Sequence, residues 1–318
     1  MKRRIVSTLL AAAMLLALAA CGGKAPAAPE TPATAEPEKP AVTTDREGNS
    51  ITLPGKITKA ISLAPAITQV MEDLGVLDTL VAVDTQSPLY VAGIDGLPQY
   101  DLITPDSEDM LKLSPDIVFV SGLSMVEAAN DPFKPLRDLG VCVAVIPSSD
   151  SIAGIEDDIR FLADCFGLSD KGEAMVTSMR ADIDAVSKIG AGIAEKRSVM
   201  FEIAAAPYIY SFGNGVFLDE MIGLIGAKNV FAEQDSWIPV SEEAAIAANP
   251  DVILTNVNYI DDSVGEILSR TGWGAVSAVK NGEVYYIDNG ASSLPNHRIV
   301  TALKQMAKAV YPEAYAAL

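Results

Sequence analysis

The feature that most constrains the fold is a unit that occurs twice, 135 residues apart. The segment from Glu108 to Phe119 aligns with the segment from Glu243 to Leu254, and the glutamate, the Pro-Asp pair and the apolar run after it match. In both copies the proline ends a helical pattern, because helical backbone is disfavoured before proline, and a buried strand follows the aspartate. We therefore expect two lobes that are built alike.

Short apolar runs alternate with helical patterns along the chain. The predicted strands cover residues 60–63, 80–83, 117–120, 141–146, 198–203, 252–254 and 284–287. Strands separated by helices are typical of βαβ units and of mainly parallel sheets. The predicted fold is α/β, with Rossmann-like lobes over residues 42–168 and 197–318.

A long helical pattern over residues 169–196 joins the two predicted lobes. Apolar residues recur every three or four positions from Val176 to Ile193, which places them along one side of a helix. A single rigid helix would limit how far the lobes can close.

Residues 1–20 resemble a bacterial lipoprotein signal peptide. A basic start at residues 2–4 precedes an apolar stretch up to Ala20, and Cys21 follows. The stretch is shorter than the ~20 residues that span a bilayer. We expect Cys21 to carry lipid and the Pro- and Ala-rich residues 21–41 to form an extended tether. The folded part would then lie at the outer face of the cytoplasmic membrane.

Composition excludes several classes of function. A net charge of −19 repels phosphate backbones and excludes nucleic acid binding. His297 is the single histidine, so we expect no metal site rich in histidine. No dinucleotide loop, nucleophile elbow or Walker lysine occurs, which leaves an extracytoplasmic α/β enzyme as a weaker alternative. Cys142 and Cys165 lie in apolar patterns and are interpreted as buried free thiols, although a disulfide between them stays open.

Several motifs, taken in order, point to a known family. They are Ala60–Thr68 with Leu74-Gly75, the two Pro-Asp units, residues 213–220, Trp237 with Val240-Ser241, Gly272-Trp273 and residues 295–299. Together they resemble the helical-backbone (class III) substrate-binding proteins of ABC importers, which include cobalamin- and ferric-siderophore-binding proteins. The resemblance implies a monomeric binding protein without a permanent cofactor. It would carry an iron- or cobalt-containing chelate to a permease dimer.

The loops at the carboxyl ends of the strands predict the ligand cleft, because ligands of α/β lobes bind there. The predicted ligand-binding residues are Ala64, Pro65, Tyr90, Tyr100, Ser121, Gly122, Tyr208, Tyr210, Phe212, Trp237, Asn258, Tyr259, Ser292 and Arg298. Tyr100 and Trp237 resemble positions where aromatics of cobalamin binders contact the ligand. Leu294 stands where an arginine can occur in those proteins.

Charge narrows the ligand class. Arg298 is the main cation of these loops, and burying a triply anionic ferric catecholate without compensation is costly. A nearly neutral corrinoid or hydroxamate siderophore fits better, and haem with a tyrosine or His297 as axial ligand is the alternative. We expect Asn296 to cap the last helix, with Arg298 in its first turn. A structural acidic partner for Arg298 is the favoured interpretation, and a carboxylate or phosphate of the ligand is the alternative.

Glu108 and Glu243 occupy equivalent positions in the two units, each in the first turn of a helix. The helix dipole alone can explain an acidic residue there. The resemblance implies instead that each glutamate forms a salt bridge with arginines of the permease. Two acidic points related by the symmetry of the lobes would suit a two-fold symmetric permease dimer.

Overall fold

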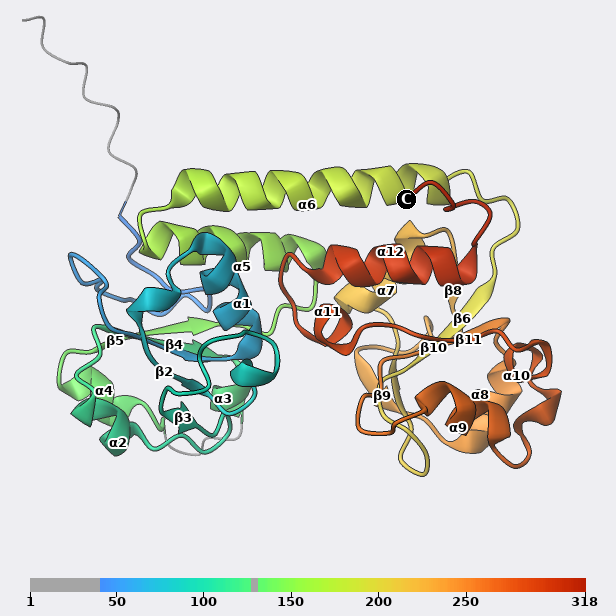
Figure 1. The fold of residues 1–318 in the computed structure, drawn as a ribbon, viewed down its shortest axis with the longest axis horizontal. Coiled ribbons are helices and arrows are strands. Elements are labelled where there is room, and N and C mark those ends of the chain that lie inside the picture. Colours follow the sequence, from blue (N-terminus) through green and yellow to red (C-terminus); the bar gives the residue numbers. More distant parts are fainter. Residues whose placement is uncertain (1–40, 127–130) are drawn as a thin grey trace, which may run out of the picture. The chain divides into compact units, whose positions relative to one another are not determined.

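The computed structural model describes residues 41–126 and 131–318. The predicted signal peptide, the lipidated Cys21 and residues 21–40 of the tether lie outside the described residues. From Ala41 onward the chain forms one compact unit that contains two parallel sheets (Figure 1). The predicted α/β fold with two parallel-sheet lobes is confirmed.

The N-terminal lobe is built on a five-stranded parallel sheet with the order β3-β2-β1-β4-β5. Four of its strands form where mostly apolar runs are buried on both faces of the sheet, and the short β3 forms by pairing with β2. The strands are β1 (Ala60–Leu63), β2 (Leu80–Asp84), β3 (Gln99–Tyr100), β4 (Ile117–Ser121) and β5 (Cys142–Ile146). The helices of this lobe are α1 (Pro65–Leu74), η1 (Leu77–Thr79), η2 (Ser87–Leu89), α2 (Ser107–Lys112), α3 (Leu123–Val126), α4 (Lys134–Asp138) and α5 (Ile152–Cys165).

The strand order reverses between β1 and β4. The chain runs outward from β1 to β2 and β3, and then adds β4 and β5 on the other side of β1. In open α/β sheets such a reversal leaves a crevice outside the carboxyl ends of the strands. The residues after β1 and β4 are therefore the ones that this fold offers to a ligand.

The C-terminal lobe repeats this plan with a four-stranded parallel sheet, β11-β10-β6-β8, and adds a small antiparallel ribbon of β7 and β9. The strands are β6 (Ser198–Glu202), β7 (Tyr210–Phe212), β8 (Lys228–Asn229), β9 (Trp237–Pro239), β10 (Val252–Thr255) and β11 (Val284–Tyr286). The helices are α7 (Phe217–Leu224), α8 (Glu242–Ala248), α9 (Ser263–Ser269), η3 (Trp273–Ala275), α10 (Ser277–Asn281), α11 (Asn289–Ser293) and α12 (Ile299–Val310).

The aspartate of each repeated unit has the same task in both lobes. Asp116 accepts hydrogen bonds from the backbone N–H groups of Thr58 and Lys59, at 2.7 and 2.8 Å, just before β1. Asp251 accepts from the backbone N–H and the hydroxyl of Ser198 at the start of β6, both at 2.8 Å. Each carboxylate thus joins the start of its own strand to that of the neighbouring strand, which explains why the pair recurs.

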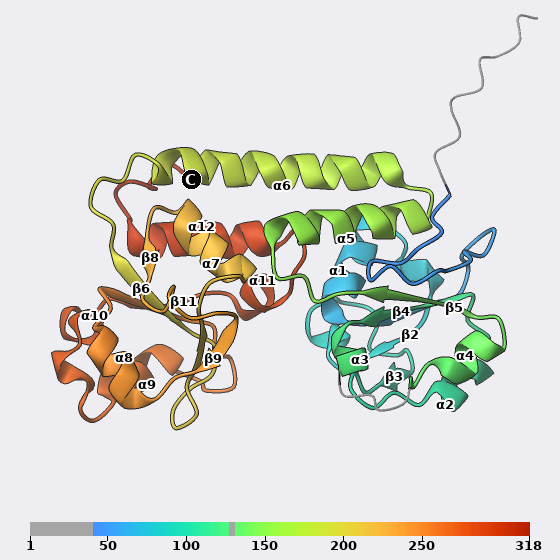
Figure 2. The same cartoon turned by 180° about the vertical axis from the view of Figure 1, so that it is seen from behind.

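The long helix α6 (Ser169–Gly190) packs on α5 in the N-terminal lobe and on α7 and α12 in the C-terminal lobe. Figures 1 and 2 show it running along both lobes. It ends at Gly190, six residues before the predicted end. A Cβ at Gly190 would lie 2.1 Å from the carbonyl oxygen of Leu224, so only glycine allows this close backbone contact. At the other end, a Cβ at Gly172 would lie 2.4 Å from that of Ala163 on α5.

Two smaller expectations concern cysteines and membrane spans. Cys142 and Cys165 are both buried and free, as interpreted from their apolar surroundings. Burial raises the pKa of the Cys142 thiol to about 11, so it stays protonated at neutral pH. Within residues 41–126 and 131–318, no helix combines the length and apolarity that crossing a bilayer requires.

Candidate functional site

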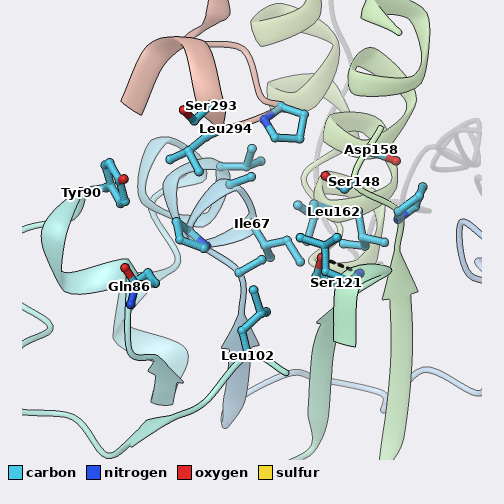
Figure 3. Close-up of a pocket in the computed structure, with 18 of the residues that line it drawn as sticks. Ile67, Gln86, Tyr90, Leu102, Ser121, Ser148, Asp158, Leu162, Ser293 and Leu294 are labelled. Atoms are coloured by element: carbon cyan, nitrogen blue, oxygen red, sulfur yellow. Dashed lines mark hydrogen bonds between the residues drawn. The ribbon is translucent and has the colours of Figure 1, made fainter. Parts of the chain in front are cut away.

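A cavity of about 230 Å³ lies at the strand-order reversal of the N-terminal lobe. We call it the N-lobe cavity. Ala64 and Pro65 after β1, Ser121 at the end of β4 and Ser148 after β5 line it, together with apolar side chains of α1 and α5. From the C-terminal lobe, Ser293, Leu294 and Pro295 reach its wall (Figure 3).

Most of the N-lobe cavity is hydrocarbon. Its aliphatic lining includes Ile67, Val70, Leu102, Ile146, Ile159 and Leu162. The side chains of Gln86 and Tyr90 supply polar atoms on one side, and those of Ser121, Ser148 and Asp158 on the other (Figure 3). Such a site binds an apolar surface and fixes it with a few hydrogen bonds.

Among the described residues of this lining, Asp158 is the one carboxylate, and it is already paired. It accepts hydrogen bonds from Arg46 Nε at 2.7 Å and from the Ser149 hydroxyl at 2.5 Å. Burial is the largest influence on this carboxyl and raises its pKa, which Ser149 and Arg46 only partly oppose. The group offers little negative charge to a ligand, because Arg46 neutralises it.

A second hollow, the rim groove, has a volume of about 460 Å³ and is lined by both lobes. The N-terminal lobe contributes Gln69, Leu89 and Tyr90. The C-terminal lobe contributes Asn258, Tyr286, Asp288, Asn289, Gly290, Ala291, Arg298 and Thr301. The predicted residues Asn258 and Arg298 therefore share one surface with Tyr90.

Arg298 is neutralised by two carboxylates of α1. Its guanidinium lies 2.6 Å from Glu72 Oε2 and 2.7 Å from Asp73 Oδ2. The structural acidic partner expected for Arg298 is thereby confirmed. Asn296, by contrast, does not cap the last helix as expected. Its Oδ1 accepts from the Arg298 backbone N–H in a turn, and α12 starts one residue later at Ile299.

His297 lies next to this cluster and outside the linings of both hollows. Its Nε2 lies 2.6 Å from Asp73 Oδ2, while Nδ1 is buried and has no hydrogen-bond partner in the part of the chain that the structure describes. Burial lowers the pKa of His297 below 6.5, against the attraction of Asp73. A neutral ring with Nε2–H donating to Asp73 satisfies this geometry.

Four of the predicted aromatics are exposed in the C-terminal lobe. Tyr208 is 83% exposed, Tyr210 40%, Trp237 37% and Tyr259 66%. Tyr210 and Trp237 belong to the β7–β9 ribbon, where Trp237 packs edge-on against buried Phe212. Tyr259 is tied to the chain before Tyr208, because its hydroxyl accepts from the Ala205 backbone N–H at 2.9 Å. These rings offer flat apolar faces to solvent.

The other predicted ligand residues lie inside the protein or behind the cavity wall. Tyr100 is buried at the end of β3 and its hydroxyl donates to Asp109 at 3.0 Å, with burial first among the causes that raise its pKa to about 12. Phe212 is fully buried. The Ser292 hydroxyl is buried between Asn256 and the Asp288 carbonyl. Gly122 binds the Ile146 carbonyl beside Ser121.

Sequence reasoning missed part of the lining. Gln86, Asp158, Asn289 and Leu294 contribute to the two hollows but were not among the predicted ligand residues. Gln86 and Asn289 follow the ends of β2 and β11, which is a signal that was available, whereas Leu294 follows the helix α11. Asp158 lies in the middle of α5, where only the packing of that helix against the sheet shows which side faces the cavity.

The glutamates predicted for permease docking are exposed in the first turns of α2 and α8. Their acidic neighbours are engaged inside the protein. Asp109 accepts from Tyr100 and Lys112, and Glu242 accepts from Trp273 Nε1 at 3.0 Å. The Asp109 side chain is nevertheless 48% exposed. Over the residues described, no group of three or more metal-binding side chains occurs.

Comparison with known proteins identifies the family. A family profile described as "Periplasmic binding protein" matches residues 61–291. The uncharacterised ABC transporter substrate-binding lipoprotein YvrC of Bacillus subtilis is 28% identical over 99% of each chain. A cobalamin-binding protein of Halobacterium salinarum is 25% identical over 98% of this chain and 86% of its own.

A solved structure shows the same fold. The molybdate periplasmic binding protein MolA of Haemophilus influenzae, bound to molybdate, superposes with a TM-score of 0.74 at 21% identity, covering 87% of this chain and 93% of its own. The family match spans both sheets and the helix between them. The chain belongs to the periplasmic binding protein family.

Proposed function

We propose that this substrate-binding protein of an ABC transporter is lipid-anchored outside the cytoplasmic membrane and captures a large, nearly neutral metal chelate. A corrinoid or a ferric hydroxamate siderophore is the ligand class that we favour. The observation that carries this proposal is the absence of an uncompensated cation in the linings of the two hollows, among the residues described.

Among the residues described, the cation that lines the hollows is paired, and the carboxylate of Asp288 in the rim groove accepts a hydrogen bond from the Ala291 backbone N–H. Arg298 is held by Glu72 and Asp73, and Asp158 is held by Arg46. An anionic ligand would have to break one of these pairs or be buried without a counter-charge, which costs several kcal/mol per ion, to order of magnitude. A neutral chelate meets no such penalty.

The exposed aromatics support a ligand with flat or extended apolar faces. Tyr208, Tyr210, Trp237 and Tyr259 lie at the carboxyl side of the C-terminal sheet, after β6 and β10 or on the ribbon beside them. Stacking on such rings contributes about 0.5–1.5 kcal/mol beyond burial of area. The relative from Halobacterium salinarum binds cobalamin, which has faces of this kind.

The anchor rests on the sequence and on the relative. YvrC, which matches along almost the whole chain, is a lipoprotein of an ABC transporter. Residues 1–21 have the features of such a signal, with Cys21 as the lipidated residue. The anchored protein would deliver its chelate as a monomer to the permease dimer.

Molybdate and haem are the competing ligands. MolA binds molybdate, and a compact oxyanion would fit a cavity of about 230 Å³. Both molybdate and the propionates of haem call for cations, and the paired state of Arg298 disfavours them. An axial role for His297 in haem binding is also disfavoured, because its Nε2 is engaged by Asp73.

Absorbance titration and native mass spectrometry with cyanocobalamin, ferric desferrioxamine B, haemin and molybdate test the proposal. We expect binding of at least one of the first two probes. Binding of haemin or molybdate alone would overturn the neutral-chelate class. Trp237→Ala should weaken chelate binding without unfolding the protein, whereas Leu139→Ala, which removes an exposed side chain before β5, should leave chelate binding unchanged.

A further inference from the structure

Tyr90 holds a special position between the two hollows. Of the residues described, it alone lines both the N-lobe cavity and the rim groove. It follows η2 in the N-terminal lobe, and its hydroxyl donates to Asn289 Oδ1 of the C-terminal lobe at 3.0 Å. One side chain thus separates two spaces and joins two lobes.

The acceptor on the other lobe is fixed in place. Asn289 Nδ2 donates to the Asn256 carbonyl at the end of β10, at 2.8 Å, so that Oδ1 faces Tyr90. The first turn of α11 is held in addition by Asp288, whose side chain accepts from the Ala291 backbone N–H at 2.7 Å. An acceptor held this way does not follow the tyrosine if the tyrosine moves.

The ring of Tyr90 also packs closely against Gly290. A Cβ at Gly290 would lie 3.0 Å from Tyr90 Cδ1 and 3.2 Å from Cε1, which is so tight that the ring would have to give by a few tenths of an ångström. The phenol therefore rests against the bare backbone of Gly290. Glycine at this position allows the ring to lie where it divides the cleft.

The volumes give this division a consequence. The N-lobe cavity of about 230 Å³ is smaller than the roughly 300–1,000 Å³ typical of pockets for drug-sized ligands. The rim groove of about 460 Å³ also has Tyr90 in its lining. A chelate larger than either hollow needs both, and the ring of Tyr90 stands between them.

We propose that Tyr90 is a specificity-determining residue that sets the size of the ligand, since a large chelate must break the Tyr90–Asn289 hydrogen bond and displace the ring to unite the two hollows. This inference rests on the proposed function. A ligand that fits the N-lobe cavity leaves the bond intact, whereas a large chelate binds less tightly by the amount needed to open it.

The test compares Tyr90→Phe, which removes the hydrogen bond but keeps the ring, with Gly290→Ala, which crowds the ring and shifts it by a few tenths of an ångström. Tyr285→Phe is the matched control, because it removes a hydrogen bond of 2.9 Å from Tyr285 to Glu283 within the C-terminal lobe. We expect Tyr90→Phe and Gly290→Ala to bind cyanocobalamin or ferric desferrioxamine B about threefold to tenfold more tightly, the range for one neutral hydrogen bond. The control should bind like the wild type.

A measurement without ligand separates this proposal from the proposed function. Amide hydrogen exchange of residues 289–294 should accelerate in Tyr90→Phe and Gly290→Ala, but not in Tyr285→Phe. Faster exchange in both variants, without chelate binding by any of the proteins, would support the role of the Tyr90–Asn289 hydrogen bond and contradict the proposed ligand class. Unchanged exchange, or chelate affinity that is unchanged or reduced in both variants, would overturn the role of Tyr90.

Discussion

Gln69 of α1 and Asn296 before α12 form a buried hydrogen bond between the lobes, with Asn296 Nδ2 donating to Gln69 Oε1 at 2.7 Å. Only 4% of Gln69 and 1% of Asn296 are exposed. A buried amide that loses its partner keeps its desolvation penalty, so this pair fixes the two lobes against each other beside the ion pairs of Arg298.

We therefore expect Asn296→Ala to lower the free energy of unfolding by about 1–3 kcal/mol. Urea unfolding followed by circular dichroism measures it, and Asn281→Ala at the exposed end of α10 is the matched control. A double change with Gln69→Ala should cost less than the sum of the single changes, because both act on one bond. Additive losses would mean that the two amides do not depend on each other.

His297 gives the protein a defined response to pH, and it is the single histidine of the chain. Because its pKa is lowered in the folded state, the unfolded state binds the proton more readily below pH 6.5. The free energy of unfolding should therefore fall as the pH drops below 6.5. Arg298 and His297 together hold the pKa of Asp73 low despite its burial, so that Asp73 stays ionised over this range.

The measurement is the free energy of unfolding between about pH 7 and about pH 5.5, for the wild type and for His297→Gln. Glutamine does not titrate, so the variant should lose the fall seen in the wild type. Histidine NMR should in parallel give a pKa below 6.5. Parallel stability curves for the two proteins would contradict the assignment.

Arg270 and Glu202 form a buried ion pair at the carboxyl end of β6. The guanidinium contacts the two Glu202 oxygens at 2.6 and 2.8 Å, and the side chains are only 5% and 1% exposed. Glu266 shares the same guanidinium. Arg270→Met leaves the buried Glu202 carboxylate without its cationic partner and should lower the free energy of unfolding by about 3–5 kcal/mol.

This loss should shrink as the pH falls toward 4.5, because burial raises the pKa of Glu202 and its neutral form then avoids the penalty. Lys134→Met is the control, since its pair with Asp138 is 68% and 60% exposed, and it should cost at most about 1 kcal/mol. A similar loss in both variants would show that burial does not govern the pair.

Glu108 and Glu243 are predicted to dock the permease. Glu108→Arg combined with Glu243→Arg should leave chelate affinity unchanged and abolish uptake in cells, because exposed charges act on encounter and register. Asp164→Arg with Glu195→Arg makes the same change of charge on other exposed positions and should leave uptake intact. Normal uptake by the first double variant, or loss of its chelate binding, would contradict the docking role.

The main strands were predictable because their signal is local. Every residue of Ile117–Ser121 and of Cys142–Ile146 is buried. Continuous apolar runs rich in β-branched residues predict such buried strands directly from the sequence. The two-residue strands β3 and β8 carry polar residues and exist through pairing with a neighbour, so no local pattern marks them.

Side-chain direction was less predictable than loop position. Tyr100 and Phe212 were expected in loops that face the cleft, but each ends a short strand. The Tyr100 hydroxyl donates to Asp109, and Phe212 packs on Phe201. The hydrogen bond between Gln69 and Asn296 joins residues separated by 227 positions, and only the folded arrangement brings them together. A sequence pattern predicts which loops lie at the carboxyl edge of the sheet. The orientation of each side chain depends instead on tertiary contacts with residues distant in the sequence.

The two glycine contacts of α6 also bear on transport. Gly172 sits on α5 and Gly190 on the backbone after α7, so each end of the 22-residue helix moves with its own lobe. Separating the lobes then requires elastic bending of the helix along its length, because neither end of the helix forms a flexible hinge. We therefore expect the importer to supply the energy that separates the lobes. After release from the importer, the protein should return to its original conformation.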